Sequence, residues 1–305
     1  MGRGNGVPYY VRQPDRGSMA PRAKSSPDSA PDPDLDTTHP DPTASSGGER
    51  RSALVVEDLS KEYESHRAVE RLSFRVAAGE ILGLVGPNGA GKTTTLRSIV
   101  GVLPIQKGRV VVCGHDLATQ EVAAKSVLAW IPDDPQPFDT LTVLEHLRFS
   151  AALYGIRDWK DRAERLLERF ELTEKRDALG GELSRGMRQK LAFCMAWIHE
   201  PGLVLMDEPL SGLDPRAIRS AKDEIRRLAQ TGTAVVLSSH QLELIQELAD
   251  RILIIDRGTK RFEGTLAEAR ATLSLGEEKS LEDIFLSATD PGPFAERAPA
   301  RTQGS

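Results

Sequence analysis

The chain has 305 residues, enough for one large domain or two of moderate size with a substantial core. Hydrophobic residues make up 39% and charged residues 28% of it, proportions that are ordinary for a globular protein. The net charge of −5 argues against a protein that coats nucleic acid, because phosphate binding requires a basic surface. The sequence contains no apolar run of about eighteen residues, so we expect no membrane span. Its N-terminus has arginines but no apolar h-region, so we expect no secretory signal.

Both ends of the chain have the composition of disordered segments. Residues 1–50 are rich in proline, aspartate and serine, and residues 291–305 are similar. Such segments bury too little apolar surface to offset the entropy lost on ordering. We therefore expect one α/β domain over residues 52–258 and a short helical extension over residues 259–290.

Between the tails, apolar runs of strand length alternate with helical patterns, which indicates an α/β layer fold. One buried run enters a glycine-rich loop, and residues 92–102 after that loop have the pattern of a helix. In chain order, the expected strands are residues 53–59, 72–79, 80–86, 108–114, 127–132, 202–208, 233–239 and 251–256.

A helical insertion, approximately residues 135–182, interrupts this alternation. Thr142 and Glu145 have the spacing of a capping box at a helix start. A second amphipathic helix is expected around residues 163–170, where apolar side chains recur at helical spacing.

The glycine-rich loop GPNGAGKT fits the pattern G-x-x-x-x-G-K-[ST] between a strand and a helix. Its glycines allow backbone N–H groups to surround phosphates, and the helix adds its positive N-terminal end. A chance turn is the alternative, but the flanking elements argue against it. Lys92 would supply a cation and Thr93 a hydroxyl ligand for Mg²⁺. The expected phosphate-binding residues are Gly86, Pro87, Asn88, Gly89, Ala90, Gly91, Lys92, Thr93 and Thr94.

Two acids, Asp207 and Glu208, follow the buried run Leu203–Met206. Open α/β sheets bind ligands at the carboxyl ends of their strands, where these acids fall. We expect Asp207 to hold Mg²⁺ through its water shell and Glu208 to polarise an attacking water. A solvated turn is the alternative. Together with the loop, the acids predict binding of Mg²⁺ and a nucleoside triphosphate.

The order of these motifs, with LSRGM at residues 183–187, SGLD at residues 211–214 and an isolated His240, resembles the ATP-binding cassette family, the ATPase subunits of ABC transporters. The resemblance covers roughly residues 52–290. It implies an α/β fold with a P-loop NTPase (RecA-like) core, an antiparallel β subdomain and an inserted α-helical subdomain. It also implies ATP and Mg²⁺ as cofactors, ATP hydrolysis, and a homo- or heterodimer of cassettes that encloses two nucleotides.

The resemblance gives further residues a role. Ser184 and Gly186 of the signature motif would cap the γ-phosphate of a nucleotide bound by a second subunit, and Asp214 would contact that subunit. His240 would reach the γ-phosphate, and Tyr63 would stack on adenine. Asp214 followed by Pro215 is also expected to cap a helix. The alternatives are an ordinary helix cap for Ser184, a surface histidine for His240 and a core aromatic for Tyr63. The expected catalytic residues are Lys92, Glu208 and His240.

Three positions depart from the usual family pattern. Arg185 replaces the first signature glycine and Met187 replaces its glutamine. Asp133 stands where a glutamine usually touches Mg²⁺ and relays to the membrane partner. We hypothesise that Asp133 is a Mg²⁺ ligand, because carboxylate oxygens suit a hard cation. Gln136 could substitute only if the loop shifted its register.

The C-terminal part, with the run LEDIF at residues 281–285, resembles cassettes that serve ABC-2 type exporters. Independently, two capping-box patterns predict two short helices there. The resemblance implies an integral-membrane permease as partner, a place at the cytoplasmic face of the cell membrane, and no nucleic-acid partner. A soluble cassette ATPase in DNA repair or on ribosomes is the alternative; its coiled-coil insertion or tandem cassette is not seen in this sequence. The capping-box pairs are Thr265/Glu268 and Ser280/Asp283.

Overall fold

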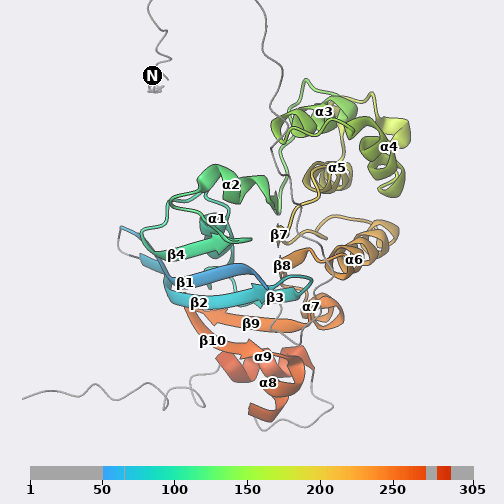
Figure 1. Cartoon of the computed structure of the whole chain (residues 1–305). Helices are drawn as coiled ribbons and strands as arrows, with labels where there is room; N and C mark the ends of the chain where they lie inside the picture. The colour runs from blue at the N-terminus through green and yellow to red at the C-terminus, as the bar shows by residue number, and fades with distance from the viewer. Residues whose placement is uncertain (1–50, 65, 273–279, 290–305) are drawn as a thin grey trace, which may run out of the picture. The chain divides into compact units, whose positions relative to one another are not determined.

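Two β-sheets organise the part of the chain that the structure, a computed structural model, describes: residues 51–64, 66–272 and 280–289 (Figure 1). The tails that we expect to be disordered, residues 1–50 and 291–305, lie outside this part. Within the described residues, no helix is both long and apolar enough to cross a membrane.

The first sheet is antiparallel, with strand order β2-β1-β4-β5. β1 and β2 alternate between buried residues and residues that are partly or fully exposed over most of their length, as expected of strands with one face on a core. The three strands expected here are confirmed, whereas the two-residue β5 is too short to leave a sequence pattern. The strands are β1 (Ser52–Tyr63), β2 (His66–Ala77), β4 (Lys107–Val112) and β5 (His115–Asp116).

The second sheet has the order β10-β9-β3-β8-β7-β6, and all its neighbouring strands except the β9–β10 pair run parallel. Every residue of β3, β7 and β8 is buried, which explains their continuous apolar runs. Their carboxyl ends therefore meet at one sheet edge. The strands are β3 (Ile81–Val85), β6 (Leu128–Ile131), β7 (Leu203–Asp207), β8 (Ala234–Ser238), β9 (Arg251–Asp256) and β10 (Thr259–Gly264).

The expected C-terminal helical extension, residues 259–290, begins with a strand instead of a helix. Arg257 and Gly258 both have positive φ, 48° and 75°, which is typical of a two-residue turn in a β-hairpin. This turn folds β10 back on β9 in antiparallel pairing. The two short helices follow as α8 (Leu266–Thr272) and α9 (Leu281–Thr289), and both predicted capping boxes are formed.

Helix α1 (Lys92–Ile99) is shorter than predicted, because Gly101 has a φ of 72° and ends the helical path. The helices of the insertion, α3 and α4, pack against each other and against α5, on one side of the sheets (Figure 1). The predicted capping box at the start of α3 is confirmed. The remaining helices are α2 (Glu121–Ser126), α3 (Val143–Leu153), α4 (Trp159–Arg169), α5 (Arg185–Trp197), α6 (Pro215–Gln230) and α7 (Leu242–Leu248).

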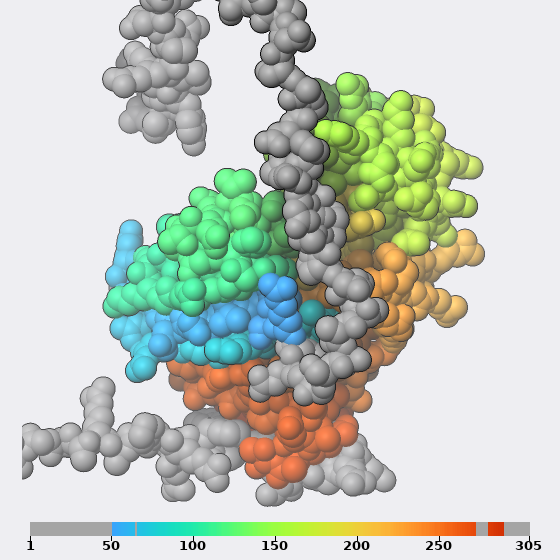
Figure 2. Space-filling model, in the orientation of Figure 1, coloured from blue at the N-terminus to red at the C-terminus, as the bar shows by residue number. Residues whose placement is uncertain are grey.

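One buried acid connects the helical insertion to the rest of the domain. The side chain of Glu224 on α6 is 5% exposed and accepts hydrogen bonds from Arg169 of α4 at 2.8 Å and from Arg227 at 2.6 Å. On the surface, the insertion and α6 lie next to each other (Figure 2). A carboxylate paired this way satisfies the hydrogen-bonding needs of a buried charge.

Candidate functional site

The glycine-rich loop between β3 and α1 adopts a backbone that favours glycine at two points. Gly89 and Gly91 have φ of 80° and 102°, in the left-handed region that other residues rarely adopt. A Cβ on Gly91 would lie only 2.4 Å from the carbonyl oxygen of Ala68, so β2 approaches the loop closely. The loop thus turns tightly into the N-terminus of α1, where backbone N–H groups can bind an anion.

Lys92, the first residue of α1, folds back over this loop. Its ammonium group donates to the carbonyl oxygens of Gly86 at 2.7 Å and Pro87 at 3.3 Å. Burial lowers the pKa of Lys92, while the charges of Glu208 and Asp207 act in the opposite direction. The ammonium is therefore placed at the loop, where phosphate oxygens could replace the two carbonyl acceptors.

Asp207 ends β7 and is almost fully buried. Its Oδ1 accepts a hydrogen bond of 2.5 Å from the hydroxyl of Ser238, its partner in the register of β7 and β8. The strand pairing therefore fixes the direction of this carboxylate. Each carboxylate oxygen has two lone pairs, so Asp207 can also accept from a metal-bound water.

Glu208 has an unusual backbone conformation, with φ of 48°. Its N–H donates to the carbonyl oxygen of Ser238 at 3.0 Å. Its carboxylate lies 2.8 Å from Nδ1 of His240 and accepts from the hydroxyl of Ser239 at 3.2 Å. Because an ionised carboxylate only accepts, Nδ1 carries the hydrogen, and Nε2 is the ring nitrogen that can face a phosphate or water. The predicted pair Glu208 and His240 is thus brought together.

A cavity of about 540 Å³ joins these groups. Its ammonium, hydroxyl and carboxylate groups fit a polyphosphate with Mg²⁺, which typically takes one or two carboxylates plus phosphate oxygens. Gly86 and Pro87 are not among the lining residues, but their carbonyl oxygens accept hydrogen bonds from Lys92. Ser184, Gly186 and Asp214 do not line the cavity either. The predicted residues that line it are Tyr63, Asn88, Gly89, Ala90, Gly91, Lys92, Thr93, Thr94, Asp133, Asp207, Glu208 and His240.

Several residues of this site were not assigned to it from the sequence. Ser238 and Ser239 orient the two acids. The cavity is also lined by His66, Ala68, Arg185 and Ser211. The two serines had a signal, because they end a buried strand directly before His240. Ser211 also had a signal, because it begins the SGLD motif, whereas His66 had no distinguishing pattern.

Asp133, the predicted metal ligand, faces a cation of its own chain. Its Oδ1 lies 3.6 Å from Nη2 of Arg185, and both side chains are about half exposed, at 53% and 52%. The same Nη2 donates to the hydroxyl of Ser211 at 3.0 Å. The contact links the loop after β6 to the start of α5 and the loop after β7.

The predicted helix caps are confirmed. Ser184 accepts from a backbone N–H of α5 at 3.3 Å, and Asp214 accepts from two N–H groups of α6, both at 3.0 Å. These bonds, foremost that from Ala217, lower the pKa of Asp214. A Cβ on Gly186 would lie 3.2 Å from the carbonyl oxygen of Gly212, so the SGLD loop lies against the signature motif.

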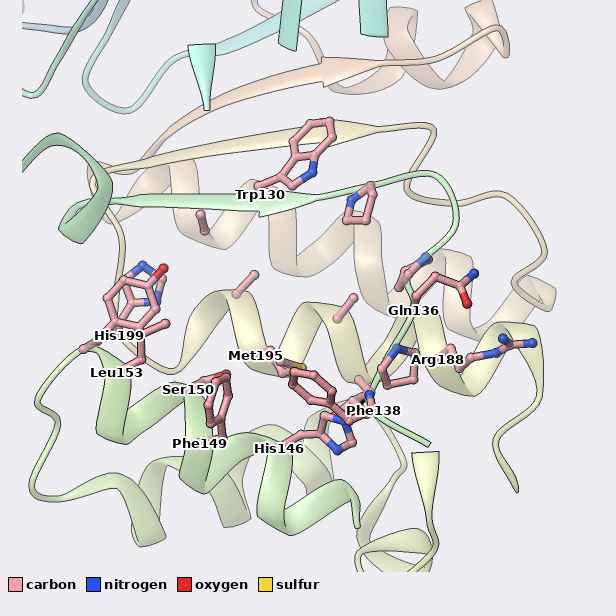
Figure 3. Close-up of a pocket in the computed structure, with 18 residues that line it drawn as sticks. Trp130, Gln136, Phe138, His146, Phe149, Ser150, Leu153, Arg188, Met195 and His199 are labelled. Atoms are coloured by element: carbon pink, nitrogen blue, oxygen red, sulfur yellow. Dashed lines mark hydrogen bonds between the residues drawn. The ribbon is translucent and has the colours of Figure 1, made fainter. Parts of the chain in front are cut away.

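A second cavity, of about 280 Å³, lies among β6, the loop after it, α3 and α5 (Figure 3). Three apolar side chains of its lining are exposed: Phe138 by 55%, Phe149 by 47% and Leu153 by 69%. The backbone N–H of Phe138 donates to Nε2 of the buried His146 at 2.9 Å. His199 and Tyr154, which both line the cavity, stack with 3.7 Å between their ring centroids. Burial of the His199 side chain lowers its pKa to about 4.

The fold and the first cavity define a P-loop nucleotide-binding protein. The family model described as "ABC transporter" matches residues 69–211. The chain is 32% identical over 240 residues to the ABC-type transporter ATP-binding protein EcsA of Bacillus subtilis (strain 168), covering 78% of this chain and 97% of that protein. This chain therefore belongs to the ABC transporter family, among its ATP-binding subunits.

Two further comparisons agree. The chain is 33% identical over 253 residues to Nod factor export ATP-binding protein I of Burkholderia pseudomallei (strain K96243), covering 80% of this chain and 82% of that protein. A solved structure of an ATP-binding subunit of an ABC transporter superposes with a TM-score of 0.75 at 32% identity, covering 78% of this chain and all of that one. The predicted P-loop core, antiparallel sheet and helical insertion are therefore those of this family.

Proposed function

We propose that this chain is the Mg²⁺-dependent ATPase subunit of an exporter, that it dimerises on ATP, and that it drives a separate permease. The observation that carries the proposal is the bond between Glu208 and His240 at a cavity that also contains Lys92 and Asp207. This arrangement supports roles for Glu208 as a base, His240 as a second hydrogen-bonding group and Lys92 as a cation at a phosphate bound in the cavity.

The chemistry is phosphoryl transfer to water, in which the protein positions groups and neutralises charge. Lys92 binds the β- and γ-phosphates, and Glu208 orients the attacking water and accepts its proton. His240 holds Glu208 through Nδ1 and turns Nε2 toward the γ-phosphate. Thr93, Asp207 and Asp133 would hold Mg²⁺, which supplies charge neutralisation when bound.

The proposed dimer is supported by three predicted site residues that do not line the cavity of about 540 Å³ in their own chain. We call this cavity, which we propose to bind the nucleotide, the nucleotide cavity. Ser184, Gly186 and Asp214 carry groups suited to a nucleotide or an interface, yet they do not line the cavity of their own chain. A second copy, or a related cassette, would bring its own Ser184 and Gly186 to the γ-phosphate. The interface would then be incomplete without nucleotide, which makes dimerisation depend on ATP.

The proposal that the chain binds a permease is supported by the surface around the second cavity. Its exposed aromatic side chains, Phe138 and Phe149, form an apolar surface of the kind that protein partners cover. This surface begins a few residues after Asp133. Asp133 lines the nucleotide cavity, so the two features are close along the chain. The permease would be of the ABC-2 type and place the chain at the cytoplasmic face of the membrane. Export is supported by relatives such as the SkfA peptide export ATP-binding protein SkfE, 38% identical over 207 residues.

The proposal is tested with Glu208→Gln in the full chain. This change keeps the shape of the side chain but removes the base, so ATP should remain bound and hold two chains together. Light scattering during gel filtration with ATP and Mg²⁺ should show a dimer. The exposed Glu243→Gln on α7 serves as the matched control and should hydrolyse ATP normally. A Glu208→Gln chain that binds ATP yet stays monomeric would contradict the proposed dimer.

A further inference from the structure

Two of the departures from the usual family pattern meet in the structure. Asp133 stands in place of a glutamine and Arg185 in place of a glycine, and the sequence alone gives no reason to connect them. In the structure, Oδ1 of Asp133 lies 3.6 Å from Nη2 of Arg185. The two residues that depart from the family pattern, Asp133 and Arg185, thus form an ion pair.

The side chain of Arg185 is held in place by contacts with the loop after β7, although it is half exposed. Its Nη2 donates to the hydroxyl of Ser211 at 3.0 Å. Its aliphatic stem passes over Gly212, where a Cβ would lie 3.0 Å from Cδ of the arginine. Gly212 has a φ of 77°, so the backbone also favours glycine there. The guanidinium is therefore held against the nucleotide cavity by the loop after β7.

Asp133 lines this cavity between two competing interactions, one with Arg185 and one with the proposed metal ion. Asp133 and Arg185 line the same cavity as Thr93 and Asp207, the proposed Mg²⁺ ligands. The guanidinium and a bound Mg²⁺ would compete for the carboxylate of Asp133, because both are cations and repel each other at short range. A half-exposed ion pair with a single contact is weak, equivalent to about two- to fivefold in an equilibrium constant. The carboxylate of Asp133 can therefore leave Arg185 for a partner that binds it more strongly.

We propose that Arg185 is a positioning residue for Asp133. It holds this carboxylate at the start of α5 while no nucleotide is bound, and the pair separates when Asp133 turns to Mg²⁺ on ATP. The inference rests on the proposed function, in which Asp133 is a metal ligand. Arg185 therefore opposes Mg²⁺ binding slightly, and the arrival of Mg²⁺·ATP releases the contact between α5 and the loop after β6.

The test measures binding, not turnover. The dissociation constant of the full chain for an ATP analogue with a non-hydrolysable β–γ bridge is determined with Mg²⁺ and with EDTA. The ratio of the two constants reports how much Mg²⁺ strengthens binding. Arg185→Gln should increase this ratio about two- to fivefold. Arg185→Lys, which keeps one charge, should stay nearer to the wild-type ratio. Lys190→Gln, which removes one charge from the same helix, should leave the ratio unchanged.

Arg185 could affect Mg²⁺ binding through its ion pair with Asp133 or through its positive charge alone. Repeating the measurement in an Asp133→Asn chain distinguishes these two effects. In Asp133→Asn chains the pair is already broken, so adding Arg185→Gln should change the ratio no further. The same increase in both backgrounds, or an unchanged or smaller ratio in Arg185→Gln, would overturn the inference. A wild-type chain that bound no nucleotide, or bound it without any help from Mg²⁺, would instead contradict the proposed function.

Discussion

Ser184→Arg tests the proposed separation of the site between two chains. The Ser184 hydroxyl makes one capping bond, at 3.3 Å, so its loss costs about 1 kcal/mol of stability. A domain stable by about 5–15 kcal/mol remains folded after that loss. Ser184 does not line the cavity of its own chain, so the dissociation constant for ATP should change by less than about twofold.

Hydrolysis should respond very differently. In the proposed dimer, the arginine fills the space next to the γ-phosphate of the other chain and removes a positioned donor. Losing one such donor costs about 100-fold or more in rate. Phosphate release measures the rate, fluorescence titration measures nucleotide binding, and thermal unfolding checks the fold. The matched control is Ser126→Arg on the exposed surface of α2. Normal hydrolysis by Ser184→Arg would refute the two-chain site.

Mixing two inactive variants provides the positive result. Lys92→Ala removes the phosphate-binding cation, while Ser184→Arg removes the other half of the site. A heterodimer of the two contains one site in which both halves are intact. With random pairing, half of the dimers are mixed and each has one site of two, so about a quarter of the wild-type rate should return. A mixture no more active than its components would contradict the assignment of Lys92 and Ser184 to opposite halves.

Two further predictions concern other side chains. Tyr63 is 43% exposed at the edge of the nucleotide cavity, so Tyr63→Ala should weaken ATP binding about fivefold through lost stacking while Tyr63→Phe binds normally, as titration would show. His199 has a pKa of about 4 in the folded chain against 6.5 as its ordinary value, so folding favours its neutral form. Stability is then full above about pH 6.5 and falls as the pH drops toward 4, by at most about 3 kcal/mol. Urea unfolding at about pH 7 and about pH 5 should show a smaller loss for His199→Phe than for the wild type; an equal loss would assign it to other groups.

Motifs with fixed local spacing could be predicted from the sequence. The loop at residues 86–93 and the buried strand before Asp207 are defined by short patterns, and the structure places both at one sheet edge. The predicted capping boxes also formed, because each involves neighbours in the chain. Strand β10 was missed because its mostly polar sequence lacks a clear alternation of apolar and polar residues. Arg-Gly is also not one of the usual hairpin dipeptides, so the positive φ of Arg257 is seen only in the structure.

Contacts between distant segments could not be predicted in the same way. Arg185 and Asp133 belong to different elements, and no spacing rule connects them. The same holds for Glu224, whose partner Arg169 comes from the helical insertion. Such pairs depend on how elements pack, which a single sequence does not encode as a local pattern.

The segment from Asp133 to Phe138 limits how independently the two cavities can behave. Its first residue lines the nucleotide cavity, and its last lines the apolar one and is bonded to His146. Fully extended, five residue steps reach no more than about 18 Å. Pro135 and Pro137 fix two of the intervening φ angles, so the segment has little slack. Its reach therefore has an upper limit, so a displacement of Asp133 that would stretch the segment beyond that limit must move Phe138 as well.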